Sequence, residues 1–295
     1  MDVGVAVPQM AEGYGPGTTV DWARGIDAGP FSSVSAGERV TFSNPEMVAT
    51  LAACAAVTER VRVFANLWVL PQHAMPMVAQ QIGTLDHLAR GRLDVAVGVG
   101  ARDDDYRAVG RDFSNRHSRL DSNIAELRQL LAGHPPFDGA EPVGPLPLQP
   151  GGPRILAGAM GPKAMRRAAR WADGISGFDI AGDREAISRV NALAERCWEE
   201  AGRDAPPVKI SGCFVAVGIG DAAETLRSFT ARYLGFLGPE LAGAIAKTAI
   251  TATPDALRGV LDGAEQAGCD EFIVVPATTD LRCLDAVADV VAARG

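Results

Sequence analysis

Residues 90–121 read RGRLDVAVGVGARDDDYRAVGRDFSNRHSRLD, and this stretch decides the fold class. Its apolar run, residues 93–99, consists of small and branched side chains and leads into Gly98 and Gly100, which predicts a buried parallel strand. Glycines at the end of such a strand let the backbone turn sharply or approach a ligand. Because binding residues of α/β proteins gather at the carboxyl ends of parallel strands, we expect residues 98–102 to face a ligand.

The same succession of apolar strand and helix recurs along the whole chain. The expected strands are 3–8, 32–36, 61–67, 93–99, 154–159, 174–178, 208–217 and 269–276. Between them lie amphipathic segments such as the stripe of Leu120, Ile124, Leu127 and Leu131. Eight strand–helix units without a sheet-edge pattern predict an α/β fold, a (β/α)8 TIM barrel. A doubly wound sheet is the alternative.

Local patterns predict where several helices begin. Thr18 with Asp21 resembles a capping box. Asn44, which is followed by a proline and a glutamate, is expected to cap the second helix. Asp183 and Thr253 are the corresponding caps expected in the second half of the chain.

Residues 134–153, HPPFDGAEPVGPLPLQPGGP, interrupt this pattern with proline and glycine. Such a segment is either a linker between domains or a surface excursion. It is short, and the strand–helix pattern resumes at once after it, so we favour a surface excursion within a single domain spanning residues 1–295.

Composition excludes several classes of partner. The formal charge is −8, from 28 Lys and Arg against 36 Asp and Glu, which argues against nucleic acid and anionic membranes. No apolar span approaches the ~20 residues of a transmembrane helix, and the N-terminus lacks the basic region of a signal peptide. The five cysteines and four histidines show no metal-ligand spacing. We therefore expect a cytoplasmic protein with a small-molecule substrate and no protein-bound metal.

Candidate site residues fall at the expected carboxyl ends of strands, which converge on one mouth in a barrel. They are Gln9, Glu38, Arg39, Asn66, Trp68 and Arg102. Glu38 suits proton transfer or hydrogen-bond acceptance, Asn66 suits a planar heterocycle, and Trp68 suits a stacking wall. The structural alternatives are a surface pair of Glu38 with Arg39 and a core-packing Trp68. His73 follows the third strand, where a lone histidine is more often a surface residue than a catalyst.

The turn after the fifth strand resembles a phosphate cradle. Its residues are Gly158, Ala159, Met160, Gly161, Pro162 and Lys163, and Arg166 and Arg167 follow in the helix. Free backbone N–H groups and the helix dipole favour an anion at such a turn. An ordinary strand–helix turn with a solvated basic face explains the pattern equally well.

Two other patterns have better structural explanations. The GxGxxA pattern from Gly218 to Ala223 falls in the seventh unit, whereas a dinucleotide fingerprint belongs in the first, so we interpret it as a turn. The acidic run 103–105 has the ligand type for Mg²⁺, but three acids in a row are more often a solvated turn or partners for Arg107 and Arg116.

The combination of motifs resembles the bacterial luciferase-like family of flavin- and deazaflavin-dependent oxidoreductases. The family pattern of the stretch 90–121 is matched by Gly91, Arg92, Gly98, Gly100, Asp105, Tyr106, Gly110, Phe113, Arg116, Arg119 and Asp121. Segments 69–92, 169–175 and 253–274 are similar to further family motifs, so the similarity spans nearly the whole chain. The resemblance implies a (β/α)8 barrel that binds reduced flavin or cofactor F420 at its C-terminal mouth, as a homodimer.

The resemblance also carries over cofactor contacts. The residues at positions that line the isoalloxazine and phosphate in the family are Asn66, Gly100, Ala101, Arg102, Gly158, Ala159, Met160, Gly161, Gly177 and Phe178. Together with Gln9, Trp68 and Lys163 they form the expected cofactor site. Arg102 or Lys163 would have to bind the phosphate. Glu38, Arg39 and His73 are the catalytic candidates.

Three functions follow from this interpretation. The preferred one is a monooxygenase that uses reduced FMN and O2 on a small organic substrate. A separate flavin reductase would supply the reduced FMN. The alternative is hydride transfer between F420 and a small organic substrate, since the anionic tail of F420 needs a basic groove such as Lys163, Arg166 and Arg167. The third is a non-catalytic flavin-binding relative.

Overall fold

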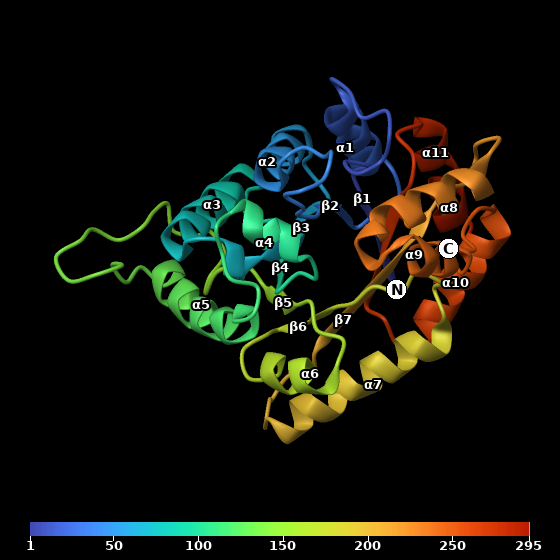
Figure 1. The fold of residues 1–295 in the computed structure, drawn as a ribbon. Helices are drawn as coiled ribbons and strands as arrows, with labels where there is room; N and C mark the ends of the chain where they lie inside the picture. Colours follow the sequence, from blue (N-terminus) through green and yellow to red (C-terminus); the bar gives the residue numbers. More distant parts are fainter. Residues whose placement is uncertain (295) are drawn as a thin grey trace.

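The computed structural model describes residues 1–294 and shows a closed barrel of eight parallel strands (Figure 1). Residue 295, the last of the predicted domain, lies outside the described residues. The strands are β1 (Asp2–Ala6), β2 (Ser33–Ala36), β3 (Arg62–Val69), β4 (Leu93–Gly98), β5 (Ile155–Ala157), β6 (Gly174–Ser176), β7 (Val208–Val215) and β8 (Glu271–Pro276).

Helices surround the barrel and cover its outer face (Figure 1). They are α1 (Thr18–Ala28), α2 (Met47–Val57), α3 (Met75–Leu88), α4 (Asp103–Ala108), α5 (Arg116–Leu131), α6 (Pro162–Ala168), α7 (Arg184–Glu200), α8 (Ala222–Tyr233), α9 (Pro239–Ala246), α10 (Pro254–Gln266) and α11 (Leu281–Ala292). Two 3-10 turns, η1 (Leu70–Gln72) and η2 (Gly235–Leu237), complete the fold. None of the helices between residues 1 and 294 combines the length and apolar character needed to cross a membrane.

Pairing between the first and last strands closes the barrel. Residues of β1 pair in register with β8, from Asp2 opposite Glu271 to Val5 opposite Val274. The predicted (β/α)8 barrel is therefore confirmed, and the doubly wound alternative is wrong, because an open sheet has two unpaired edges. The barrel interior is filled by alternate strand residues, which include Ala6, Phe64, Ala96, Leu156, Ile210 and Ile273.

An ionic network fills the N-terminal end of the barrel. Glu271 is 3% exposed and accepts hydrogen bonds from the Ser32 and Ser33 hydroxyls, both at 2.6 Å, and from Arg62 at 2.5 Å. Asp94 accepts two hydrogen bonds from Arg154, at 2.9 and 2.5 Å. Buried carboxylates are stable only when paired in this way, so this end of the barrel is sealed and the opposite end is left for a ligand.

A bulge in β3 shapes that opposite end. Ala65 pairs with Val95 and Trp68 pairs with Val97, so β3 contains one residue more than β4 over the same interval. Asn66 and Leu67 occupy the bulge, and the peptide bond between them is cis. A bulge bends a strand and changes the direction of its side chains, and here it carries two residues of the site described below.

Two of the predicted helix caps are wrong. Gly17, not Thr18, is the N-cap of α1, and the Thr18 hydroxyl accepts a hydrogen bond from the Gly15 N–H instead of forming a capping box. The cap of α2 is Glu46, whose carboxylate accepts from the N–H groups of its second and third helical residues at 2.9 and 2.7 Å. The predicted cap Asn44 lies outside the helix and donates to backbone carbonyls. The predicted caps Asp183 and Thr253 are confirmed.

The proline- and glycine-rich segment between α5 and β5 contains no helix or strand from residue 132 to residue 154, and it extends from the barrel at the left of Figure 1. Its return arm is fixed to α3. The buried Asp86 carboxylate accepts from the N–H groups of Leu148 and Gln149 and from the Gln149 side chain, at 2.7, 3.1 and 2.8 Å. Gly83 lies where the segment crosses the helix.

Replacing Gly83 with Ala should detach this arm from α3. An added Cβ would lie 1.8 Å from the Pro145 carbonyl oxygen, so either the arm or the helix must move. We expect faster limited proteolysis within residues 134–153 and a loss of roughly 1–3 kcal/mol in the free energy of unfolding. Gly259 is the matched control, because it is also helical and a Cβ there meets nothing within 4 Å. Digestion of the Gly83→Ala variant at the wild-type rate would contradict the proposed anchoring.

Candidate functional site

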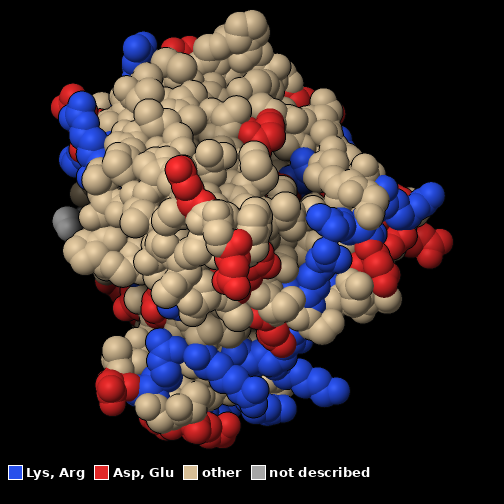
Figure 2. Space-filling view, turned by 90° about the vertical axis from the view of Figure 1, so that its left-hand side faces the viewer, with Lys and Arg blue, Asp and Glu red and all other residues tan. Residues whose placement is uncertain are grey.

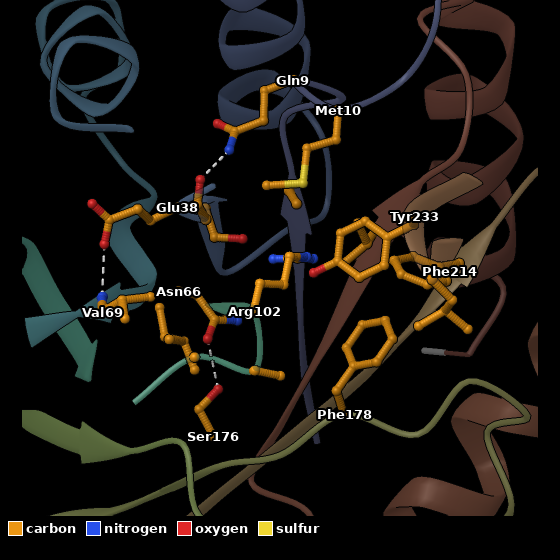
Figure 3. Close-up of a pocket in the computed structure, with 18 of the residues that line it drawn as sticks. Gln9, Met10, Glu38, Asn66, Val69, Arg102, Ser176, Phe178, Phe214 and Tyr233 are labelled. Carbon is orange, nitrogen blue, oxygen red and sulfur yellow. Dashed lines mark hydrogen bonds between the residues drawn. The ribbon is translucent and has the colours of Figure 1, made fainter. Parts of the chain in front are cut away.

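A cavity of about 320 Å³ opens at the carboxyl ends of the strands (Figure 3). Strand ends from β1 to β4 and from β6 to β8 supply its floor and walls, and the segment from α8 to η2 covers one side. Its polar lining residues are Gln9, Ser35, Glu38, Asn66, Gln72, Arg102, Asp105, Ser176 and Tyr233. The remaining lining is apolar, as in most small-molecule sites.

The β3 bulge forms one face of the cavity. Leu67 occupies space that exists because Gly98 and Gly158 have no side chain; a Cβ on Gly158 would lie 2.5 Å from a methyl group of Leu67. Asn66 accepts a hydrogen bond from the Ser176 hydroxyl at 2.8 Å (Figure 3). Its amide nitrogen has no hydrogen-bond partner within residues 1–294 and is left to donate to a ligand.

Aromatic rings form the opposite wall. Phe178 and Phe214 lie 4.7 Å apart between ring centroids, and Phe214 lies 5.1 Å from Tyr233 and 5.0 Å from Phe229. Edge-to-face and tilted contacts of this kind are favourable beyond the area they bury. The wall presents an apolar surface to the cavity.

Glu38 lines the cavity, but its carboxylate is occupied. One oxygen accepts from the Val69 N–H at 2.7 Å and the other lies 2.6 Å from the His73 ring nitrogen. Figure 3 shows the carboxylate turned toward Val69 and away from Arg102. No surface pair of Glu38 with Arg39 is formed among the described residues. Of the two predicted roles for Glu38, this geometry favours the hydrogen-bond acceptor that holds β3 in place.

Trp68 does not form the predicted stacking wall. Its side chain is 0% exposed, belongs to the main hydrophobic core, and contacts the His73 ring edge-to-face at 6.2 Å. The bulge explains the error, because one extra residue at Asn66–Leu67 turns Leu67 toward the cavity and Trp68 toward the helices.

The acidic run begins a helix rather than a solvated turn. Asp104 pairs with Arg107 at 3.1 Å, as predicted for this run, whereas Asp105 is buried and accepts a hydrogen bond from the Thr41 N–H at 2.7 Å. Burial alone would raise the pKa of Asp105, but the hydrogen bonds from Thr41 and the nearby Arg102 and Arg39 hold it below its usual value. Asp105 thus fixes the loop after β2 to the start of α4.

The remaining predicted residues divide between the cavity and its surroundings. Gln9, Gly100, Ala101, Arg102, Gly177 and Phe178 line it together with Glu38 and Asn66. Arg39 lies beside it and donates to the Tyr233 carbonyl at 3.2 Å. Gly158 and Ala159 line a separate hollow, Met160 lines a small one beside Phe178, and Lys163 is exposed.

Sequence reasoning missed several lining residues, above all Leu67, Met10, Ser176, Leu234 and Phe236. Ser176 is the last residue of β6, so its position at a strand end could have predicted it. Leu234 and Phe236 follow α8 in an irregular segment, and no periodicity indicates which way such residues point. Nowhere in residues 1–294 do three or more His, Cys, Asp or Glu side chains form a group able to hold a metal ion.

Comparison with known proteins places this barrel in a family. The model of the luciferase-like monooxygenases matches residues 1–275. The chain belongs to the luciferase-like monooxygenase family. The resemblance noted from the motifs is therefore confirmed.

Relatives of this luciferase-like chain differ in how much of it they cover. An uncharacterised protein of Mycobacterium tuberculosis is 35% identical over 165 residues, which are 52% of this chain and 54% of that protein. The chain thus spans about half the length of the curated relatives it matches first. Among solved structures, the monooxygenase RslO1 from Streptomyces bottropensis is 20% identical with a TM-score of 0.77 and covers 100% of this chain and 99% of its own. An F420-dependent secondary alcohol dehydrogenase in complex with an F420-acetone adduct is 18% identical with a TM-score of 0.79 and covers 99% of this chain and 98% of its own. These two structures share the fold.

Proposed function

We propose that this protein is an oxidoreductase that binds a flavin-type cofactor in the cavity and acts on a small organic substrate. Within that class we propose a monooxygenase using reduced FMN and O2. The observation that carries the proposal is the apolar cavity at the barrel mouth, with the Asn66 amide free to donate beside the β3 bulge. A planar ring system with polar edges matches that arrangement.

Buried polar atoms support the fit of a flavin. Two side-chain oxygens that belong to cavity residues, Gln9 Oε1 and Gln72 Oε1, are buried without a hydrogen-bond partner in the described part of the chain. Unpaired buried polar atoms are unfavourable, and the ring N–H and carbonyl groups of a flavin are suitable partners for amide groups. We assign Asn66, Gln9 and Gln72 to the ring system, and Gly158 to Lys163 to its phosphate.

Reduced FMN, when bound, supplies the two electrons that O2 activation requires. The contribution of this chain is to bind and orient the cofactor and to keep water out of the cavity. Asn66, fixed by Ser176, orients the ring, and the wall of Phe178, Phe214 and Tyr233 excludes water. The pair of Glu38 and His73 holds the end of β3 and thereby the bulge.

Cofactor F420 is the second candidate, and a basic surface favours it. Lys163, Arg166 and Arg170 are exposed in and next to α6. Figure 2 shows Lys and Arg side chains gathered at the bottom of the molecule, where α6 and α7 lie in Figure 1. A long anionic tail would find counter-charges there. Arg167 is partly used, because it binds Asp121 at 2.7 Å.

Parallel titration with FMN and F420 separates these cofactors. We expect micromolar affinity for FMN, measured by absorbance and fluorescence, and O2 uptake when reduced FMN and a substrate are present. F420 binding without FMN binding would overturn the monooxygenase in favour of hydride transfer. Tight FMN binding without any turnover across a substrate panel would favour the non-catalytic relative.

We also propose that the protein is a cytoplasmic homodimer served by a separate flavin reductase. All five cysteines are free, which suits a reducing compartment. The incompletely buried residues of α2 are all apolar: Val48, Ala49, Ala52, Ala53, Ala56 and Val57. A helix that is apolar on every side needs cover. Light scattering that gives the mass of a single chain would contradict the dimer.

A further inference from the structure

Three arginines gather around one aromatic cluster at the rim of the cavity. The guanidinium carbons of Arg39 and Arg102 each lie 5.1 Å from the centroid of the Tyr233 ring. Arg39 also lies 3.8 Å from the Phe42 ring centroid, and Arg232 lies 4.6 Å from the same ring. Two positive charges therefore share one tyrosine ring beside the cavity.

Few carboxylates offset these charges. The nearest oxygen of Asp105 is 3.5 Å from Arg102, and the N–H and hydroxyl of Thr41 both donate to its other oxygen. Glu12 lies 3.7 Å from Arg232, but its side chain is 84% exposed, so water screens that pair. Within residues 1–294 the three arginines thus have one buried carboxylate between them.

Both central arginines have unused hydrogen-bonding capacity. The Nε atoms of Arg39 and Arg102 are buried without partners among the described residues. Burial, followed by the charge of Arg102, lowers the pKa of Arg39 to about 10. A cationic group in such surroundings is stabilised by a neighbouring anion. The cluster is therefore short of negative charge in the absence of a ligand.

Arg102 is the member that reaches the ligand space. It lines the cavity, its side chain is 11% exposed, and Figure 3 shows its guanidinium in the middle of the pocket near Tyr233. Its single hydrogen bond to the described chain is the one to Asp105 at 3.5 Å. An arginine with free N–H groups in an apolar pocket is suited to a carboxylate, which it binds with charge-assisted hydrogen bonds.

We propose that the substrate carries a carboxylate that binds Arg102, and an apolar body that packs against Phe178 and Phe214. This deepens the proposed function and rests on it, because the cavity is taken to hold both cofactor and substrate. A cofactor phosphate is an anion of similar chemistry. We place it elsewhere, at the turn from Gly158 to Lys163, since Gly158, Ala159 and Met160 line other hollows and not the cavity that Arg102 lines.

The test compares a carboxylate with its neutral amide. Calorimetric titration of FMN-loaded protein with 3-phenylpropanoate and 3-phenylpropanamide should show at least about tenfold tighter binding of the acid. Arg102→Gln should abolish that preference, and Arg102→Lys, which keeps the charge, should retain part of it. Arg107→Gln is the matched control, because Arg107 lies on α4, the helix that follows Arg102, with its side chain 73% exposed, and the change should leave the preference unchanged.

A second arm identifies the source of the anion. Arg102→Gln should leave the ratio of FMN to riboflavin affinity unchanged. Selective loss of FMN affinity would overturn the proposal and assign Arg102 to the cofactor phosphate, as would equal binding of acid and amide by the wild-type protein. The same titrations on cofactor-free protein distinguish the two proposals. If the protein prefers the carboxylate but binds neither FMN nor F420, the proposed cofactor is refuted and the carboxylate site at Arg102 is supported.

Discussion

Replacing Gly37 with Ala is expected to lower FMN affinity by about 10- to 100-fold. Gly37 follows β2 and lines the cavity, and a Cβ there would lie 2.7 Å from the Asn66 carbonyl oxygen and 3.5 Å from its carbon. The clash is with backbone, so it cannot be relieved by rotating a side chain. The bulge must move, and the Asn66 amide moves with it, away from the hydrogen bond to Ser176.

The measurement is an FMN titration beside a thermal unfolding curve. Gly220→Ala is the control, since a Cβ at Gly220 meets nothing within 4 Å and the residue is exposed. Wild-type affinity in the Gly37→Ala variant would show that the position of the bulge does not determine cofactor binding. A large loss of unfolding free energy together with the loss of affinity would make the effect structural rather than local.

Replacing Glu271 with Ala should destabilise the barrel by about 3 kcal/mol, which corresponds to roughly 6 °C in Tm. The change leaves the hydroxyls of Ser32 and Ser33 without their acceptor and removes one of the two counter-charges of Arg62, the other being Asp94 at 3.3 Å. Arg62 is partly exposed, at 31%, so water offsets part of the penalty.

Glu265→Ala is the matched control for this prediction. Glu265 also binds two cations, the N-terminal ammonium at 3.0 Å and Arg294 at 2.6 Å, but it is 52% exposed. Its removal should change the free energy of unfolding by less than about 1 kcal/mol. Equal effects of the two substitutions in denaturant titration would show that burial of the network adds nothing to the stability of the barrel.

The barrel was predictable because each strand–helix unit repeats one pattern. A buried parallel strand is a short apolar run, and eight such runs with helices between them leave few other folds. The motif pair Asp105 and Tyr106 owes its recognisability to structure: Asp105 binds Thr41, and the Tyr106 hydroxyl donates to the Val99 carbonyl at 2.7 Å.

The site was only partly predictable, for two physical reasons. The single extra residue in β3 reversed the facing of Leu67 and Trp68, and no composition rule places a bulge. Part of the aromatic wall comes from α8 and the turn after it, a segment that follows β7 at a distance set by loops. Residues at strand ends, such as Gln9, Asn66 and Arg102, were found because topology alone brings them together.

The cavity is built from two sources that differ in how freely they can change. Its floor depends on closely packed main chain, because Gly37, Gly98 and Gly158 leave the space that the β3 bulge occupies. Part of its aromatic wall comes from one contiguous piece, residues 229–236, which carries Phe229, Tyr233 and Phe236. Exchanging residues 229–236 is therefore expected to change which molecules the cavity accepts. The β3 bulge and the glycines around it would stay as they are.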